Sequence, residues 1–223
     1  MTMMKTVVVT ACALLAVAGF AVLPFLVMDA PVAYDIYFNQ KIFYYHVPAA
    51  ITMFVSVFVS GIASVGYLVT RKPGWDDTAV AAGDLVLFFG AIMLLTGPIW
   101  GKVAWGVYWV WDARLTSSLL LWMVFVAYAL IRRYGGPGSE RLSAGLALFG
   151  MVDVPLVYFA VNFWRTQHPT NSVIPKLQGG MRTAFLVAVV SYFALYIVLL
   201  LARRGVRQAE RRLHDLAEEI VIE

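Results

Sequence analysis

Long runs of apolar residues, separated by short polar or turn-forming segments, dominate this chain. Six of the runs approach the ~20 residues that a helix needs to cross a hydrocarbon core about 30 Å thick. The pattern therefore predicts membrane spans at about 7–28, 47–69, 80–99, 115–131, 142–161 and 184–201. The fourth run is short and is interrupted early by Thr116, Ser117 and Ser118, which favours a start inside the headgroup layer.

The connections between the spans are short and rich in turn-forming residues. Arg71-Lys72-Pro73-Gly74 and Gly135-Gly136-Pro137-Gly138 are typical helix-ending turns. Neither an internal repeat nor a segment with the composition of a soluble domain is present. We therefore expect an all-α integral membrane protein, a six-transmembrane-helix bundle that forms one membrane domain over residues 1–223.

Composition supports the membrane interpretation. The chain is 61% hydrophobic and 13% charged, whereas about 25% of the residues of an ordinary soluble domain are charged. The net charge is +4, but the basic residues are spread over loops and tails and form no basic face with interleaved aromatics. Nucleic-acid binding is therefore disfavoured, and membrane topology explains the basic residues better.

The distribution of Lys and Arg predicts the orientation of the bundle. With the N-terminus in the cytoplasm, eleven of the 17 basic residues fall on the inner side and six on the outer side. The outer six are Lys41, Lys102, Arg114, Arg165, Lys176 and Arg182. The positive-inside rule then places both termini in the cytoplasm. The charged tail, residues 202–223, is expected to form a short cytoplasmic surface helix.

The first span has an alternative interpretation as a cleaved signal peptide. Ala16-Val17-Ala18 resembles a small-residue cleavage site. The apolar run from Val7 to Met28 is long for a signal core, which favours a retained helix. Cys12 is the single cysteine, so a disulfide within the chain and a Cys-x-x-Cys-His haem attachment motif are both excluded.

Four of the seven tryptophans fall within residues 100–114, which we call the Trp segment. Its aromatic residues are Trp100, Trp105, Tyr108, Trp109 and Trp111. A membrane boundary normally holds one or two Trp, whereas this cluster offers several flat faces to a planar, hydrophobic, partly charged ligand. If the run is helical, Trp105 and Trp109 share a face.

Two of the three histidines lie on the same predicted side of the membrane as the Trp segment. His46 precedes the second span and His168 lies between the fifth and sixth, while His214 is in the charged tail. Two histidines from separate segments can ligate one haem iron, and the six outer cations include partners for its propionates. The alternative is interfacial aromatics plus two histidines that bond backbone groups.

Trp105-Gly106-Val107-Tyr108-Trp109-Val110-Trp111-Asp112 resembles the tryptophan-rich WWD signature of haem-handling proteins, and Ala113-Arg114-Leu115-Thr116-Ser117 continues the pattern. Within that group the chain is similar to the CcmC family, the haem exporter proteins C of cytochrome c maturation. That family has six spans, the signature between the third and fourth, and two essential outer histidines, whose places His46 and His168 match. Tyr108 stands where many members have another Trp.

The resemblance implies a haem site on the periplasmic side of a bacterial inner membrane. It implies non-covalent haem b, with His46 and His168 as iron ligands. The other implied contacts are Trp100, Trp105, Tyr108, Trp109, Trp111, Asp112 and Arg114. It also implies delivery to a periplasmic haem chaperone (CcmE), together with the membrane and ATPase subunits of an ABC transporter and a small membrane subunit (CcmD). The chain has no Gly-x-x-x-x-Gly-Lys-[ST] motif, so ATPase activity is expected in partners, and binding rather than enzymatic chemistry in this chain.

Three other functions are weighed against haem delivery. A cytochrome c haem lyase of the related Ccs or CcmF type would be longer, and a b-type membrane cytochrome would carry its histidines within the spans. A haem permease would need a translocation path, and polar residues within the spans are few.

Two acidic residues have open roles. Asp153, near the middle of the fifth span and before Pro155, is either functional or a protonated group bonded to a neighbouring helix, and the second is favoured. Asp112 either supports the Trp segment through backbone or Arg114, or faces the ligand. Structural support is favoured, because a carboxylate repels haem propionates.

Overall fold

The computed structural model describes residues 3–32, 37–169 and 173–222, and within these residues the only regular elements are helices. The α-helices are α1 (Met3–Asp29), α2 (Phe43–Thr70), α3 (Pro73–Trp105), α4 (Ala113–Tyr134), α5 (Ser139–Phe163) and α6 (Gly179–Ile222). Two short 3₁₀ helices, η1 (Tyr37–Ile42) and η2 (Ile174–Lys176), lie in connections. The prediction of an all-α fold is confirmed.

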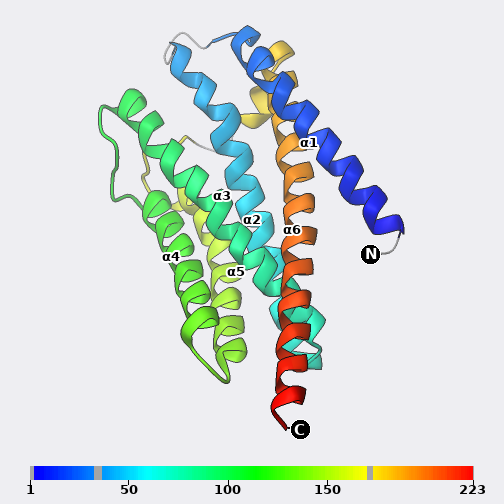
Figure 1. Cartoon of the computed structure of the whole chain (residues 1–223). Helices are drawn as coiled ribbons and strands as arrows, with labels where there is room; N and C mark the ends of the chain where they lie inside the picture. The colour runs from blue at the N-terminus through cyan, green and yellow to red at the C-terminus, as the bar shows by residue number, and fades with distance from the viewer. Residues whose placement is uncertain (1–2, 33–36, 170–172, 223) are drawn as a thin grey trace.

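Each of the six α-helices is long and apolar enough to cross a membrane, which confirms the prediction of a multi-pass six-helix protein. The helices run alternately up and down (Figure 1), so the α1–α2, α3–α4 and α5–α6 connections gather at one end of the bundle. We call this the Trp end, because it carries the Trp segment. The α2–α3 and α4–α5 connections and the end of α6 lie at the other end. The cytoplasmic position of the termini remains a prediction.

Two helices continue beyond their predicted spans. Helix α3 reaches Trp105 and so includes the start of the Trp segment. Helix α6 runs through the charged tail to Ile222 without interruption, so the tail is helical as expected but is continuous with the sixth span. No proline interrupts this stretch, and two tail arginines, Arg203 and Arg211, pair with acidic residues of α3.

Helix α2 is the centre of the bundle and packs against α3, α5 and α6, while α1 packs on α6 and α4 packs on α5 and α3. Hydroxyl groups on α2 tie it to α3: Ser56 donates to the Ala82 carbonyl at 2.8 Å, and Ser60 donates to the Ala79 carbonyl at 2.9 Å. Small residues allow such close helix approach in a membrane. These hydrogen bonds hold α2 and α3 together and so help to position the residues at the Trp end of both helices.

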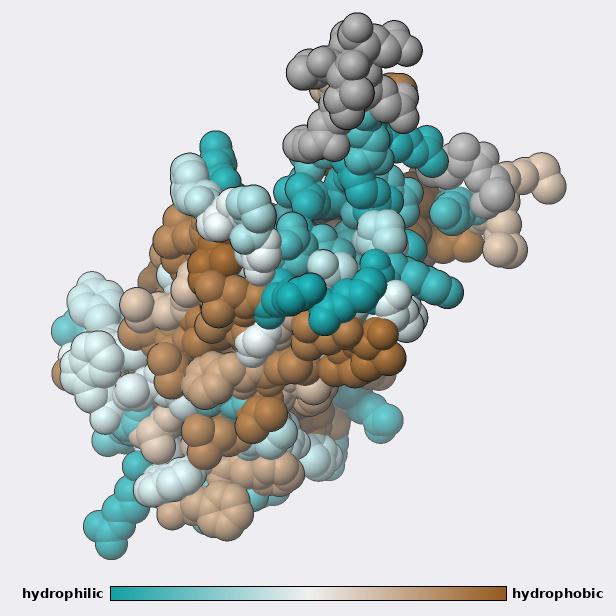
Figure 2. Space-filling view, turned by 90° about the horizontal axis from the view of Figure 1, so that it is seen from below, coloured by the Kyte–Doolittle hydropathy of each residue, from teal (hydrophilic) through white to brown (hydrophobic). Residues whose placement is uncertain are grey.

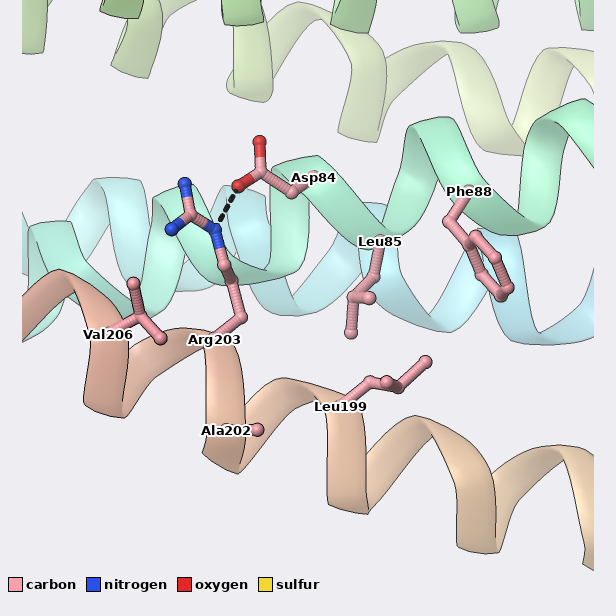
Figure 3. Close-up of a pocket in the computed structure, with 7 residues that line it drawn as sticks. All are labelled: Asp84, Leu85, Phe88, Leu199, Ala202, Arg203 and Val206. Atoms are coloured by element: carbon pink, nitrogen blue, oxygen red, sulfur yellow. Dashed lines mark hydrogen bonds and ion pairs between the residues drawn. The ribbon is translucent and has the colours of Figure 1, made fainter.

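The end of the bundle opposite the Trp segment is held by ion pairs between helices. Asp76 of α3 pairs with Arg132 of α4 at 2.6 Å, and Asp77 of α3 pairs with Arg211 of α6. Asp84 pairs with Arg203 at 2.6 Å beside a shallow groove of about 380 Å³ between α3 and α6 (Figure 3). Seen from this end, hydrophilic residues gather on one side of the surface, and hydrophobic residues cover the neighbouring flank (Figure 2).

Candidate functional site

Within the Trp segment, helix α3 continues up to Trp105. Gly106 follows with φ 78°, a left-handed conformation that glycine adopts without steric cost and that ends α3. Residues 106–112 are irregular, and α4 begins at Ala113. Trp105 and Trp109 therefore do not share a helix face, and the arrangement that a continuous helix would give is not formed.

The tryptophans form two edge-to-face pairs instead. Trp100 and Trp105 have ring centroids 5.4 Å apart, and Trp109 and Trp111 have centroids 5.8 Å apart. Such pairs are favourable beyond the area that they bury. Trp111 is 76% exposed, so this ring is available to a ligand or partner.

Lys102 fixes the turn at the end of α3. Its Nζ donates to the Gly106 carbonyl at 2.9 Å and lies 5.4 Å from the centroid of the Tyr108 ring. Tyr108 is itself 61% exposed. Tyr108 thus keeps an accessible aromatic face at this position.

Asp112 joins the Trp segment to the connection that carries His168. One carboxylate oxygen, Oδ1, accepts from the Leu115 amide at 2.8 Å and caps α4. The other, Oδ2, accepts from the Gln167 amide at 2.9 Å. Both oxygens are therefore used by backbone donors, which supports the structural interpretation of Asp112 over a direct contact with ligand.

His46 lies in the first turn of α2, against α3. Its Nδ1 is 2.9 Å from the Thr96 hydroxyl oxygen, and that hydroxyl donates its own hydrogen to the Ile92 carbonyl at 2.7 Å. Because the hydroxyl hydrogen is already used, the oxygen accepts from the ring. The neutral His46 ring therefore carries its hydrogen on Nδ1 and leaves the Nε2 lone pair free.

His168 has the same tautomer as His46, and in His168 this tautomer is fixed by a neighbouring residue of the α5–α6 connection. Its Nδ1 is 2.9 Å from the Pro169 carbonyl oxygen, which can only accept, so Nδ1 carries the hydrogen. Burial lowers the pKa of His168 from 6.5 to about 4, and the positive charge of Arg114 adds to this effect. At neutral pH the ring is uncharged, and its Nε2 lone pair is available to a metal.

The fold brings these residues together from distant parts of the chain. The imidazoles of His46 and His168 are close enough to interact electrostatically, and each also interacts with Arg114 at the start of α4. Arg114 has a buried guanidinium nitrogen without a hydrogen-bond partner. Two imidazole nitrogens of the kind that can ligate a metal and one incompletely satisfied cation thus lie at the Trp end.

Three other cations that the sequence places on the outer side lie at the surface of the Trp end. Arg165 lines a shallow pocket of about 340 Å³ with Val110, Trp111, Asp112, Thr166 and Gln167. Lys176 and Arg182 are exposed on the α5–α6 connection and the first turn of α6. They form no part of this pocket's wall.

Three residues of the site were not identified from the sequence. Thr96 and Gly97 of α3 lie against the His46 ring, and Gln167 provides the amide that Asp112 binds. A hydroxyl residue within the third apolar run is a weak signal for Thr96. Nothing in the local sequence distinguishes Gln167, because its contact is made by the backbone.

The donor set fits haem. Haem needs axial ligands, aromatic or apolar faces and cations for its propionates, and the two Nε2 atoms, the exposed rings and Arg114 have these properties. The indole nitrogens of Trp100 and Trp109 are also buried without acceptors. A bound group with acceptor oxygens would satisfy such donors.

Comparisons with known proteins give a consistent result. The family described as "Heme exporter protein C" (CcmC) matches residues 1–219. A "Heme exporter protein C" of Bradyrhizobium diazoefficiens is 37% identical over 196 residues, which cover 84% of this chain and 73% of that protein. The protein of the same description from Escherichia coli K12 is 33% identical over 183 residues, covering 78% of this chain and 72% of the relative.

A more distant relative comes from a plant. A "Putative cytochrome c biosynthesis ccmC-like mitochondrial protein" of Arabidopsis thaliana is 30% identical over 161 residues, covering 72% of this chain and 61% of that protein. The similarity to proteins of this description thus extends beyond bacteria.

Proposed function

Because this chain belongs to the haem exporter protein C (CcmC) family, we propose that it binds haem b non-covalently at the Trp end and delivers it for cytochrome c maturation. Haem is here the cargo of the protein. The family supports a role in haem delivery, and the name of its members implies an ABC-type haem export system. The site on this chain is argued from its own residues.

The observation that carries the proposal is the shared protonation state of the two histidines. Both rings donate from Nδ1 to a fixed acceptor, and both keep Nε2 free. Metal-ligating histidines in proteins have this arrangement, because the outer hydrogen bond fixes the tautomer and the ring plane. We propose that His46 and His168 are the two axial ligands of the haem iron.

The remaining residues have separate roles in the proposal. Arg114, whose guanidinium lacks a complete set of partners, binds a propionate. The exposed rings of Tyr108 and Trp111 cover the porphyrin, and Trp100, Trp105 and Trp109 support them or contact its edge. Asp112 holds the Trp segment against the His168 connection. When bound, the haem supplies only its iron and its planar surface to these contacts.

The Trp end is proposed to face the periplasm of a bacterial inner membrane, where a haem chaperone of the CcmE type takes the cargo. The pocket of about 340 Å³ beside Trp111 and Arg165 lies at the surface, next to the proposed haem edge. ATP hydrolysis is proposed to lie in the ABC transporter subunits, and a small subunit (CcmD) to complete the complex. This chain then acts by binding and presentation, without an enzymatic step of its own.

The test is haem retention and transfer in the membrane complex. We expect His46→Gly and His168→Gly each to lower the haem bound per protein and the haem transferred to a CcmE-type chaperone, and added imidazole to restore part of the bound haem. His214→Gly, in the tail, is the matched control and should behave as wild type. Normal transfer by both site variants would overturn the proposal.

A further inference from the structure

The two proposed ligands are held by different means. His168 donates to the carbonyl of the adjacent residue, Pro169, so its tautomer is fixed within its own connection. His46 depends on acceptors of α3 instead: its Nδ1 lies 2.9 Å from the hydroxyl oxygen of Thr96, 50 residues away in the chain, and the ring also interacts with the Met93 backbone carbonyl. Of these acceptors, the Thr96 hydroxyl is the one that a substitution can remove.

The Thr96 hydroxyl is itself held in one orientation. It donates to the Ile92 carbonyl at 2.7 Å and lies 3.3 Å from the Met93 carbonyl. Both carbonyls can only accept, so the hydroxyl hydrogen points to the helix backbone and a lone pair points to the ring. A hydroxyl in open solvent could rotate and donate to the ring, but this one has its hydrogen engaged.

The backbone of α3 also lets the ring come close. A Cβ atom added at Gly97 would lie 3.3 Å from Cε1 and 3.8 Å from Nδ1 of His46. Glycine therefore leaves the room in which the Nδ1–Cε1 edge lies against the helix. Thr96 and Gly97 together determine which edge of the ring faces α3 and which nitrogen remains for a ligand.

We propose that Thr96 is a positioning residue for haem binding: its hydroxyl accepts from Nδ1–H of His46, keeps that tautomer, and so presents Nε2 to the iron. This rests on the proposed function, in which His46 is an axial ligand. Thr96 touches neither the iron nor the porphyrin in this account. It acts through the imidazole, as acceptors behind metal-bound histidines do.

The proposed role of Thr96 links the iron ligand to the rest of helix α3. Helix α3 carries Thr96 and, farther along, Trp100 and Trp105. The same rigid element therefore sets the direction of one iron ligand and the start of the Trp segment. A displacement of α3 at this end would move the ligand and the aromatic residues together.

The variants are chosen to remove the acceptor without changing the shape. Thr96→Val is isosteric and has no hydroxyl, whereas Thr96→Ser keeps the hydroxyl. Thr78→Val is the matched control: Thr78 bonds the Gly74 carbonyl in the same way on the same helix, at the end opposite the Trp segment. A general effect of losing a helix-bonded hydroxyl would appear in Thr78→Val as well.

The measurements are haem affinity, the visible spectrum and the midpoint potential of the haem-loaded full chain in detergent. Loss of an acceptor behind a metal-bound histidine typically costs about 10–100-fold in affinity. We expect that loss in Thr96→Val, with a more positive potential because the ligand is less basic, and near-normal values in Thr96→Ser and Thr78→Val. The midpoint potential is measured at a saturating haem concentration, so that variants with weaker affinity are also fully loaded.

The outcomes separate this inference from the proposed function. If wild type has a histidine-ligated spectrum that His46→Gly removes, and Thr96→Val matches wild type in affinity and potential, Thr96 has no positioning role. If His46→Gly leaves the wild-type spectrum unchanged, the ligand assignment itself fails and the Thr96 inference falls with it. A fall in affinity for Thr96→Val with an unchanged potential would indicate a packing effect and would also overturn the inference.

Discussion

Replacing Asp112 by Asn should separate its two structural roles. Asparagine caps a helix about as well as aspartate, so the bond from the Leu115 amide to the cap is kept. The amide side chain has only one oxygen, so it cannot also accept from the Gln167 amide, whose bond to Oδ2 is 2.9 Å. Asp112→Asn therefore breaks the link between the Trp segment and the His168 connection and leaves α4 intact.

The magnitude follows from the kind of bond that is lost. A hydrogen bond to a charged group contributes about 1.5–3 kcal/mol, and the lower end applies here because this bond lies at the surface. A loss of about 1.4 kcal/mol corresponds to a factor of ten in an equilibrium constant. Haem affinity should therefore fall about tenfold in Asp112→Asn. The fall should be larger in Asp112→Ala, which also loses the cap, worth about 1 kcal/mol.

The assay is haem titration of the protein in detergent, combined with hydrogen exchange of the segment containing Gln167. Faster exchange at Gln167 in Asp112→Asn, together with the loss in affinity, is the expected result. Unchanged exchange and unchanged affinity would refute the argument that this carboxylate holds the two segments together. Higher affinity in Asp112→Asn would instead indicate that the carboxylate repels the propionates.

The remaining predictions concern stacking, topology and the ion pairs. The Trp109→Ala/Trp111→Ala double variant should hold several-fold less haem per protein, because loss of each aromatic contact costs on the order of 0.5–1.5 kcal/mol beyond area burial; normal retention would reduce the pair to a membrane anchor. In a cysteine-free background, a thiol label at Pro137→Cys should react from the cytoplasm and one at Lys176→Cys from outside, as the Lys/Arg distribution requires; the reverse would invert the site. Arg132→Met should lower the stability measured by thermal unfolding in detergent by about 3–5 kcal/mol, because it leaves a largely buried acidic partner uncompensated; an unchanged unfolding temperature would contradict this.

The helices were predictable from the sequence because their signal is local. Each apolar run is by itself long and hydrophobic enough to cross the membrane as a helix, and the structure has one helix for each predicted span. The ends were less predictable, because they depend on single residues and on neighbours. Gly106 ends α3 within the Trp segment, and ion pairs to α3 accompany the continuation of α6 through the tail.

The types of residue at the site were also predictable, but not their partners. Histidines and aromatics are conspicuous in an apolar chain, and the Lys/Arg distribution is enough to group them at one end. The contact between His46 and Thr96 joins residues of two helices, and the contact of Asp112 with Gln167 uses a backbone amide. Neither leaves a pattern along the sequence, because both arise only when the segments are packed.

The most direct test of the account is the low-temperature electron paramagnetic resonance spectrum of the ferric haem-loaded protein. Ligation by His46 and His168 predicts a low-spin signal in wild type, replaced by a high-spin signal when either histidine is changed to glycine. A spectrum that is high-spin in wild type, or low-spin and identical in both glycine variants, would contradict the central claim that these two residues hold the haem iron.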